Sequence, residues 1–399
     1  MSSVALRTII LCRPGPWQHW LASRSWQHNN NNVTLYTPVL SVPVIKCWER
    51  KLKMTLTLEL SVDSSNVESL KSGARKIISH VRPEWKQDEL QYKVYTDGIT
   101  NQLIGVWYND RNSQLLIRVY GQMTEKFIDR GVEKNNFEIL HKAGCGPELH
   151  AVFENGLCYG YIVGEPVTPD QIIQVPIWEC VANEMATFHR IQVENKEHPI
   201  LFPKIRRFFS LMPNKFSDPE KQKRLEKSGY TKEGLQKEVE VLADKLESLK
   251  CPVVFSHNDI LLANVIWNNN KRTVNFIDYE YGGPNFQPFD IANHFNEFAG
   301  IDEVDYSRYP NKAFQCKWLR TYLAGYTKRA QEDVLEEEVE KWYVWVNKFA
   351  LSSHLFWGSW AMVQAEYSTI DFDFLGYGII RLNEHFAKKD EYLGLKVSC

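Results

Sequence analysis

Alternating apolar and polar positions predict an antiparallel sheet in the first half of the chain. Short runs rich in β-branched and aromatic residues are separated by turn-forming segments such as Thr96-Asp97-Gly98 and Asn109-Asp110. A charged helical pattern over 128–142 stops at Gly144, and Glu154-Asn155-Gly156 has the composition of a hairpin turn. The expected strands cover 90–95, 103–108, 115–120, 149–153 and 157–162. The predicted order is therefore β-β-β-α-β-β.

Helical periodicity dominates after a connector at 164–169. Helical patterns cover 176–190, 235–249 and the long proline-free stretch 334–367. The exception is 253–278, where short strands surround a polar segment. We therefore expect an α+β protein with a small antiparallel-sheet lobe over 55–165 and a large, mainly helical lobe over 166–399.

The first 54 residues show neither helical nor strand periodicity and include a polar tract at 27–32. We expect a disordered extension there. An organelle presequence was considered because the segment contains arginines, but Pro14 and Pro16 interrupt an amphipathic helix. A translation start at Met54 is a further hypothesis.

Composition narrows the class of protein. A chain of 399 residues that is 44% hydrophobic can bury a sizeable core. The net charge of −2 and the lack of a basic block interleaved with aromatic residues argue against a nucleic-acid partner. No apolar run reaches the roughly 18 residues that span a bilayer, so membrane insertion is not expected. Because a nucleic-acid footprint is missing, we expect a small-molecule substrate. The eight cysteines are scattered without a C-x-x-C pair, which favours reduced thiols in a cytoplasmic protein.

The polar segment after residue 256 predicts phosphoryl transfer. Asp259 is followed five residues later by Asn264 and, fourteen residues further, by Asp278 at the end of an apolar strand. Kinase-fold enzymes use this arrangement to orient a hydroxyl group and to hold Mg²⁺ on ATP. Asp259 would accept the hydroxyl proton, and Asn264 and Asp278 would supply hard oxygen ligands. Taken singly, Asp259 and Asn264 could instead cap local turns.

The sequence contains no Walker A motif, so the turn at 96–101 is the candidate phosphate cradle. Its backbone N–H groups, the Thr100 hydroxyl and the Asn101 amide could fold over phosphates, although an ordinary hairpin turn is the commoner explanation of such a segment. We expect the adenine contacts around Gly160 and Ile162.

Arg118 lies on the third predicted strand, where protein kinases place a phosphate-pairing lysine, and Glu133 lies on the following helix. An ion pair between them would aim the guanidinium at the α and β phosphates of ATP, a task that its planar fork suits. The alternative is a surface arginine on a half-exposed strand.

Trp357 and Trp360 are three residues apart on the long helical pattern, so their rings share one face. Such a face could bind a small cation, since each ring attracts an ammonium group by roughly 0.5–2 kcal/mol. Core packing is the commoner use of such a tryptophan stripe.

Several motifs together resemble the choline/ethanolamine kinase family over residues 74–388. Segments 96–101, 296–300 and 371–375 look more like the ethanolamine branch than the choline branch. The resemblance implies a protein-kinase-like two-lobed fold and the ATP- and Mg²⁺-dependent phosphorylation of ethanolamine to phosphoethanolamine, the first step towards phosphatidylethanolamine. The motifs are His257-Asn258-Asp259, Phe276-Ile277-Asp278-Tyr279-Glu280-Tyr281, Asp290-Ile291-Ala292-Asn293-His294-Phe295-Asn296-Glu297-Phe298 and Ser353-His354-Leu355-Phe356-Trp357-Gly358-Ser359-Trp360.

The resemblance also implies roles for single residues. Asp259 is similar to the family's catalytic base, Asn264 and Asp278 to its magnesium ligands, and Glu280 to a nearby acid that acts on the metal through water. Glu297 would neutralise the ammonium group, with a charge-assisted hydrogen bond that a trimethylated nitrogen cannot make. The residues that match the amino-alcohol pocket are Tyr281, Glu297, Tyr306, Trp357, Trp360 and Tyr377.

The chain departs from the family pattern between Asp259 and Asn264. It reads Ile260-Leu261-Leu262-Ala263 where ethanolamine kinases usually carry Leu-Leu-Cys-Lys, so a positive charge near the transferred group is lost and turnover could be slower. Ala292 also replaces a usual glycine. A choline or dual-specificity kinase and a catalytically silent kinase-fold scaffold remain the alternatives, and a homodimer is one assembly that the sequence leaves open.

Overall fold

The computed structural model describes residues 55–95, 101–121, 130–193, 197–368 and 370–397. Contacts group Lys53–Cys399 into one compact unit. The expected extension over 1–54, its alternatives and Thr100 lie outside the described residues. The predicted lobe boundary after residue 165 stays a prediction.

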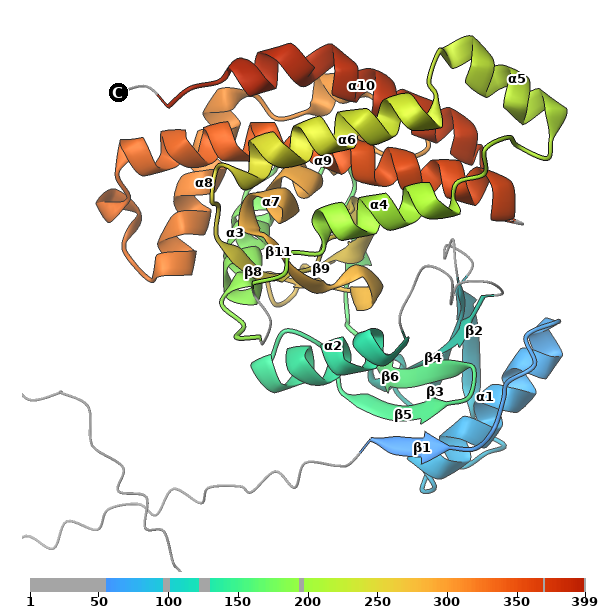
Figure 1. The fold of residues 1–399 in the computed structure, drawn as a ribbon. Helices are drawn as coiled ribbons and strands as arrows, with labels where there is room; N and C mark the ends of the chain where they lie inside the picture. The colour runs from blue at the N-terminus through green and yellow to red at the C-terminus, as the bar shows by residue number, and fades with distance from the viewer. Residues whose placement is uncertain (1–54, 96–100, 122–129, 194–196, 369, 398–399) are drawn as a thin grey trace, which may run out of the picture. The chain divides into compact units, whose positions relative to one another are not determined.

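A six-stranded sheet forms the first part of the described chain (Figure 1). All its neighbouring strands are antiparallel except the pair β1 and β5, which is parallel. The five predicted strands are all present, each with its ends within two residues of the prediction. In the spatial order β1-β5-β6-β4-β3-β2, the strands are Leu56–Leu58, Leu149–Phe153, Gly156–Gly160, Leu115–Tyr120, Asn101–Trp107 and Gln91–Tyr95.

Two helices accompany this sheet, α1 (Val67–Val81) and α2 (Arg130–Ala143). The Asn66 side chain caps α1 by accepting a hydrogen bond from the Ser69 N–H. The buried stripe of α1 packs with the sheet residues Ile104 and Ile117 in one apolar cluster. The helix α2 was expected from the sequence pattern, whereas α1 and β1 were not.

Helices dominate the rest of the chain, as predicted. The 32-residue helix α9 is central because it packs against α4, α7, α8 and α10 (Figure 1). The α-helices are α3 (Ile177–His189), α4 (Leu201–Leu211), α5 (Pro219–Ser228), α6 (Lys232–Glu247), α7 (Gln287–Asn296), α8 (Lys312–Thr327), α9 (Glu336–Tyr367) and α10 (Phe374–Gly394). Short 3₁₀ turns lie at Arg111–Ser113, Leu262–Asn264, Tyr279–Tyr281, Glu297–Ala299, Tyr306–Arg308 and Gln331–Asp333.

Short strands between α6 and α7 carry the polar segment singled out in the sequence. β8 (Val253–Ser256) pairs with β11 (Gly283–Phe286), and β9 (Val265–Asn268) pairs with β10 (Thr273–Phe276). β9 also pairs with β7 (Glu165–Pro166) in the connector. Asp259 therefore follows the end of β8, and Asp278 follows the end of β10.

The larger apolar cluster joins α2 to the helices around α9 and contains buried aromatic residues such as Phe255, Phe276 and Trp318. Over the part of the chain that the structure describes, no helix combines the length and the apolar character that crossing a membrane requires.

Candidate active site

The backbone after β8 is held by one buried carboxylate. Asp290 on α7 accepts hydrogen bonds from the N–H groups of His257, at 2.8 Å, and Asn258, at 2.7 Å. His189 on α3 contributes a third contact, with its Nε2 2.9 Å from Asp290 Oδ2. Burial favours a higher pKa for the Asp290 carboxyl, but its hydrogen bonds outweigh burial and lower the pKa. Asp290 is thus an anion that fixes the loop leading to Asp259.

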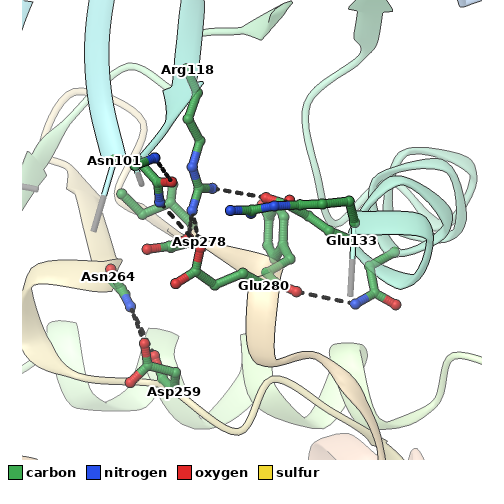
Figure 2. A network of polar contacts seen from close by, with 12 residues as sticks. Asn101, Arg118, Glu133, Asp259, Asn264, Asp278 and Glu280 are labelled. Carbon is green, nitrogen blue, oxygen red and sulfur yellow. Dashed lines mark hydrogen bonds and ion pairs between the residues drawn. The ribbon is translucent and has the colours of Figure 1, made fainter. Parts of the chain in front are cut away.

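The Asp259 side chain is nearly buried and meets the amide of Asn264. The Asn264 Nδ2 group donates to the Asp259 carbonyl at 2.9 Å and to its Oδ2 at 3.2 Å (Figure 2). Burial, followed by the charges of Asp278, Glu297 and Glu280, raises the pKa of Asp259 well above its ordinary value. Cations near this carboxylate therefore favour its ionised form.

Asp278 lies at the turn after β10, in the left-handed region with φ of 68°. A backbone hydrogen bond of 3.0 Å from the Ile277 N–H to the Asn264 carbonyl joins this turn to the Asn264 turn. The structure thus brings together Asp259, Asn264 and Asp278, as the sequence spacing led us to expect.

Arg118 on β4 is a buried cation that joins three acids (Figure 2). Its Nη1 lies 3.2 Å from Oε1 of Glu133 on α2, and its Nη2 lies 2.7 Å from Asp278 Oδ1 and also contacts Glu280. Burial raises the pKa of Glu280 to about 7, with a further contribution from Asp278 and an opposing one from Arg118. Arg118 is 5% exposed, so the surface-arginine alternative is wrong for the described structure.

Asn101, one of the residues expected to surround ATP, contacts this cluster. Asn101 begins β3 and donates from Nδ2 to Glu280 Oε2 at 3.3 Å. Gly160 ends β6, where it pairs with Leu115 of β4, and half-buried Ile162 follows before the connector.

The aromatic residues of the expected amino-alcohol pocket meet edge to face. The ring centroid of Trp357 lies 5.2 Å from that of Tyr281 and 5.5 Å from that of Trp360. The Trp357 indole Nε1 donates to Asn293 Oδ1 at 2.8 Å. All three rings are largely buried, so they pack in the core, and their contact with a cation stays a prediction.

Glu297 has a buried partner that sequence reasoning missed. Arg381 on α10 places Nη1 2.7 Å from Glu297 Oε1 and 3.0 Å from the Tyr377 hydroxyl. Tyr306 lies nearby, with its ring centroid 5.3 Å from that of His354.

A cavity of about 620 Å³ opens beside Glu297. The connector, the turn at Leu261, Leu262 and Ala263, and residues 299–303 line its wall. The departure from the family pattern at Ala263 therefore faces this cavity, and Arg308 lines it as well.

Lys204 on α4 is a second missed residue. Its ammonium group lies 3.4 Å from the Tyr281 carbonyl and 5.1 Å from the Tyr281 ring centroid. Burial lowers the pKa of Lys204 to about 8, against the opposing charges of Glu280 and Asp259. The signal was present in the sequence, because Lys204 falls on the apolar stripe of α4 between Leu201 and Phe208.

Comparisons with known proteins identify the family of this chain. The model of the family described as Choline/ethanolamine kinase matches residues 93–386. Ethanolamine kinase 1 of Homo sapiens is 43% identical over 345 residues, which cover 85% of this chain and 76% of the human protein. The probable ethanolamine kinase of Nematostella vectensis is 44% identical over 331 residues, which cover 80% of this chain and 94% of that protein.

Solved structures confirm the predicted kinase-like fold with its sheet lobe and helical lobe. The structure of Plasmodium vivax ethanolamine kinase has a TM-score of 0.72 at 24% identity and covers 84% of this chain and 94% of its own. The choline kinase from Cryptosporidium parvum has a TM-score of 0.66 at 25% identity, with 80% and 96% covered. By both its sequence and its fold, the chain belongs to the choline/ethanolamine kinase family.

Proposed function

We propose that this protein transfers the γ-phosphoryl group of ATP to the hydroxyl of ethanolamine and so forms phosphoethanolamine, the first step towards phosphatidylethanolamine. The convergence of Asp259, Asn264 and Asp278 carries this proposal. Relatives named ethanolamine kinase, at about 40% identity over most of the chain, support the choice of substrate.

Asp259 is the proposed base. It accepts the proton of the ethanolamine hydroxyl as the oxygen attacks phosphorus, and the Asn264 amide holds its carboxylate in place. The raised pKa of Asp259 makes it a stronger base, provided that nearby cations keep it ionised.

Asn264, Asp278 and Glu280 are the proposed ligands of Mg²⁺. One amide and two carboxylates provide hard oxygen donors, which fit this ion. Among the described residues, no group of three or more His, Cys, Asp or Glu side chains is arranged to hold a metal ion. The proposed site therefore relies on the Asn264 amide as well as on the two carboxylates. A bound Mg²⁺ would neutralise charge on the phosphates, which share its coordination in kinases.

The nucleotide is assigned to the sheet side of the cluster. Arg118 pairs with the α and β phosphates, and Glu133 holds its guanidinium in that orientation. Asn101 contacts the phosphates, and the adenine lies near Gly160 and Ile162.

The amino end of the substrate is assigned to the helical side. Glu297 accepts a hydrogen bond from the ammonium group, and the faces of Trp357, Trp360, Tyr281 and Tyr377 stabilise its charge. Tyr306 completes this pocket.

A transfer assay tests the function. The purified chain is incubated with labelled ATP, Mg²⁺ and either ethanolamine or choline. We expect label in phosphoethanolamine, a higher kcat/KM for ethanolamine and loss of turnover on chelation of the metal. If kcat/KM for choline equals kcat/KM for ethanolamine, the dual-specificity alternative is favoured.

A silent kinase-fold scaffold makes a different prediction. Calorimetric titration with Mg·ATP should give saturable binding to the enzyme, whereas a scaffold need not bind the nucleotide.

The homodimer and the cytoplasmic location also remain proposals. Sedimentation of the purified chain tests the first, and fractionation of the source cells tests the second.

A further inference from the structure

The acid proposed to bind the substrate ammonium is already paired within the protein. Glu297 and Arg381 are 4% and 2% exposed, and their closest charged atoms are 2.7 Å apart. A carboxylate buried this deeply is costly to ionise alone, so Arg381 stabilises its charge. Glu297 therefore presents a nearly neutral pair rather than a full negative charge.

Arg381 also fixes where Glu297 points. Its Nη1 is shared between Glu297 Oε1 and the Tyr377 hydroxyl, and its Nη2 donates to Ser353 Oγ at 2.9 Å. Three hydrogen bonds on a planar guanidinium leave little freedom for the group to turn.

The network continues to the catalytic loop. The Ser353 hydroxyl donates to Asn293 Oδ1 at 2.8 Å, where the Trp357 indole also donates. The Asn293 amide in turn donates to the Asn258 carbonyl at 3.4 Å, next to Asp259. The ion pair is thus connected by hydrogen bonds to Trp357 and to the segment that carries Asp259, the proposed base.

One oxygen of Glu297 stays available. Among the described residues, Oε1 bonds to Arg381 and no hydrogen bond is made to Oε2. Glu297 also lines the cavity of about 620 Å³. An N–H group that enters from this cavity can therefore donate to an acceptor whose direction Arg381 has set.

We propose that Arg381 is a positioning residue that selects for ammonium groups bearing N–H. This inference rests on the proposed function of the pocket. The negative charge of Glu297 alone would attract any cation, and Arg381 offsets that charge. What remains is an oriented acceptor oxygen, with which only an N–H donor can form a hydrogen bond. A quaternary ammonium gains from the aromatic faces alone.

A series of acceptors with decreasing numbers of N–H groups tests this selection. We compare kcat/KM for ethanolamine, its N-methyl and N,N-dimethyl derivatives, and choline. The wild type should show its steepest fall at the last methyl group, where the final N–H is lost. Arg381→Met should lower the ethanolamine-to-choline ratio by roughly tenfold. Arg381→Lys keeps the charge but loses the planar fork that orients Glu297, so it should retain only part of the ratio.

Matched controls separate selection from general damage. Arg224→Met removes an exposed arginine that pairs with Asp373 at the start of α10, and it should leave the ratio unchanged. The KM for ATP should stay at the wild-type value in Arg381→Met and Arg381→Lys. A folded Arg381→Met protein with the wild-type ratio would overturn the inference.

A binding measurement on the wild type covers the case in which Arg381→Met does not fold. Ethylammonium and tetramethylammonium, which have no hydroxyl, are titrated by calorimetry in the presence of Mg·ADP. We expect ethylammonium to bind more tightly, and equal or tighter binding of tetramethylammonium would refute the role of Arg381. If the wild type phosphorylates neither ethanolamine nor choline, the proposed function fails, while this titration still decides the inference.

Discussion

Asp290 accepts the backbone N–H of Asn258 at 2.7 Å, and this contact joins α7 to the loop that carries the proposed base. Asn258 has φ of 67°, a left-handed conformation that is unfavourable for most side chains. The Asp290 carboxylate stabilises that conformation with two backbone hydrogen bonds. Its removal should affect turnover even though it does not reach the substrate.

Asp290→Asn should lower kcat and the free energy of unfolding together. The amide can replace only one of the two acceptors, and the mismatch leaves a buried group unsatisfied at a cost of about 1–3 kcal/mol. Urea unfolding and steady-state assays measure both effects. Asp244→Asn on the exposed face of α6 is the control. Wild-type kcat in Asp290→Asn would separate Asp290 from the geometry of the base.

Asp259→Ala should abolish turnover while ATP binding survives. A lost general base typically costs about 10²–10⁴ in rate. Arg118 pairs with Glu133, Asp278 and Glu280 rather than with Asp259, so the nucleotide side should be intact. Labelled-ATP assays and calorimetry measure the two properties. If the variant keeps more than roughly a few per cent of wild-type activity, the rate loss is too small for a missing general base, and Asp259 is ruled out as the base.

Trp357→Ala should raise the KM for ethanolamine more than the KM for ATP. The substitution removes a ring from the proposed cation site and also leaves Asn293 Oδ1 with one donor fewer. Trp345→Ala on the same helix, where the ring contacts Trp342, is the control. Equal effects on the two KM values would return Trp357 to a packing role.

Lys204→Met should move the acidic limb of the kcat profile to higher pH. The Lys204 charge favours the ionised form of the nearby Asp259 and Glu280, so its loss raises their pKa values and leaves less active base at a given pH. Lys215→Met at an exposed position is the control. An unchanged pH profile would show that Lys204 does not act on the base.

Stability should fall as the pH drops from 6.5 towards 4. Burial lowers the pKa of His294 to about 4, so the folded protein binds its proton less readily than the unfolded chain. The contribution of His294 is complete above the unfolded pKa and is lost as pH falls towards the folded pKa. At pH 5 the loss should be about 2 kcal/mol, and His294→Gln should reduce the slope of unfolding free energy against pH. Urea unfolding at several pH values tests this, with the exposed His80→Gln as control.

Local patterns in the sequence predicted most of the fold. Strands such as Leu149–Phe153 could be predicted because their signals, alternating apolar and polar residues bounded by turn-forming residues, occupy neighbouring positions in the sequence. β1 was missed because its three residues form a strand only by pairing with β5, about ninety residues away along the chain. α1 was missed although Asn66 and the apolar spacing from Leu70 to Val81 signal a capped helix.

The candidate site divides in the same way. Asp259, Asn264 and Asp278 lie within one short segment, so their spacing alone indicated a shared centre. Arg381 reaches Glu297 across 84 positions of the chain, and only tertiary packing brings the two together. Their pairing could not be predicted from spacing, although a charged residue on the apolar face of a helix was a signal.

Helix α7 turns its polar stripe towards the interior. Asp290, Asn293, His294 and the C-cap residue Glu297 fall on one side of it at intervals of three and four residues, and all four are buried. An extra residue inserted between Ile291 and Ala292 would rotate the later part of this stripe by about 100°. Proton acceptance and amine recognition would then be lost together. The protein should therefore tolerate substitutions in the elements that pack around α7 far better than any change in the length of α7.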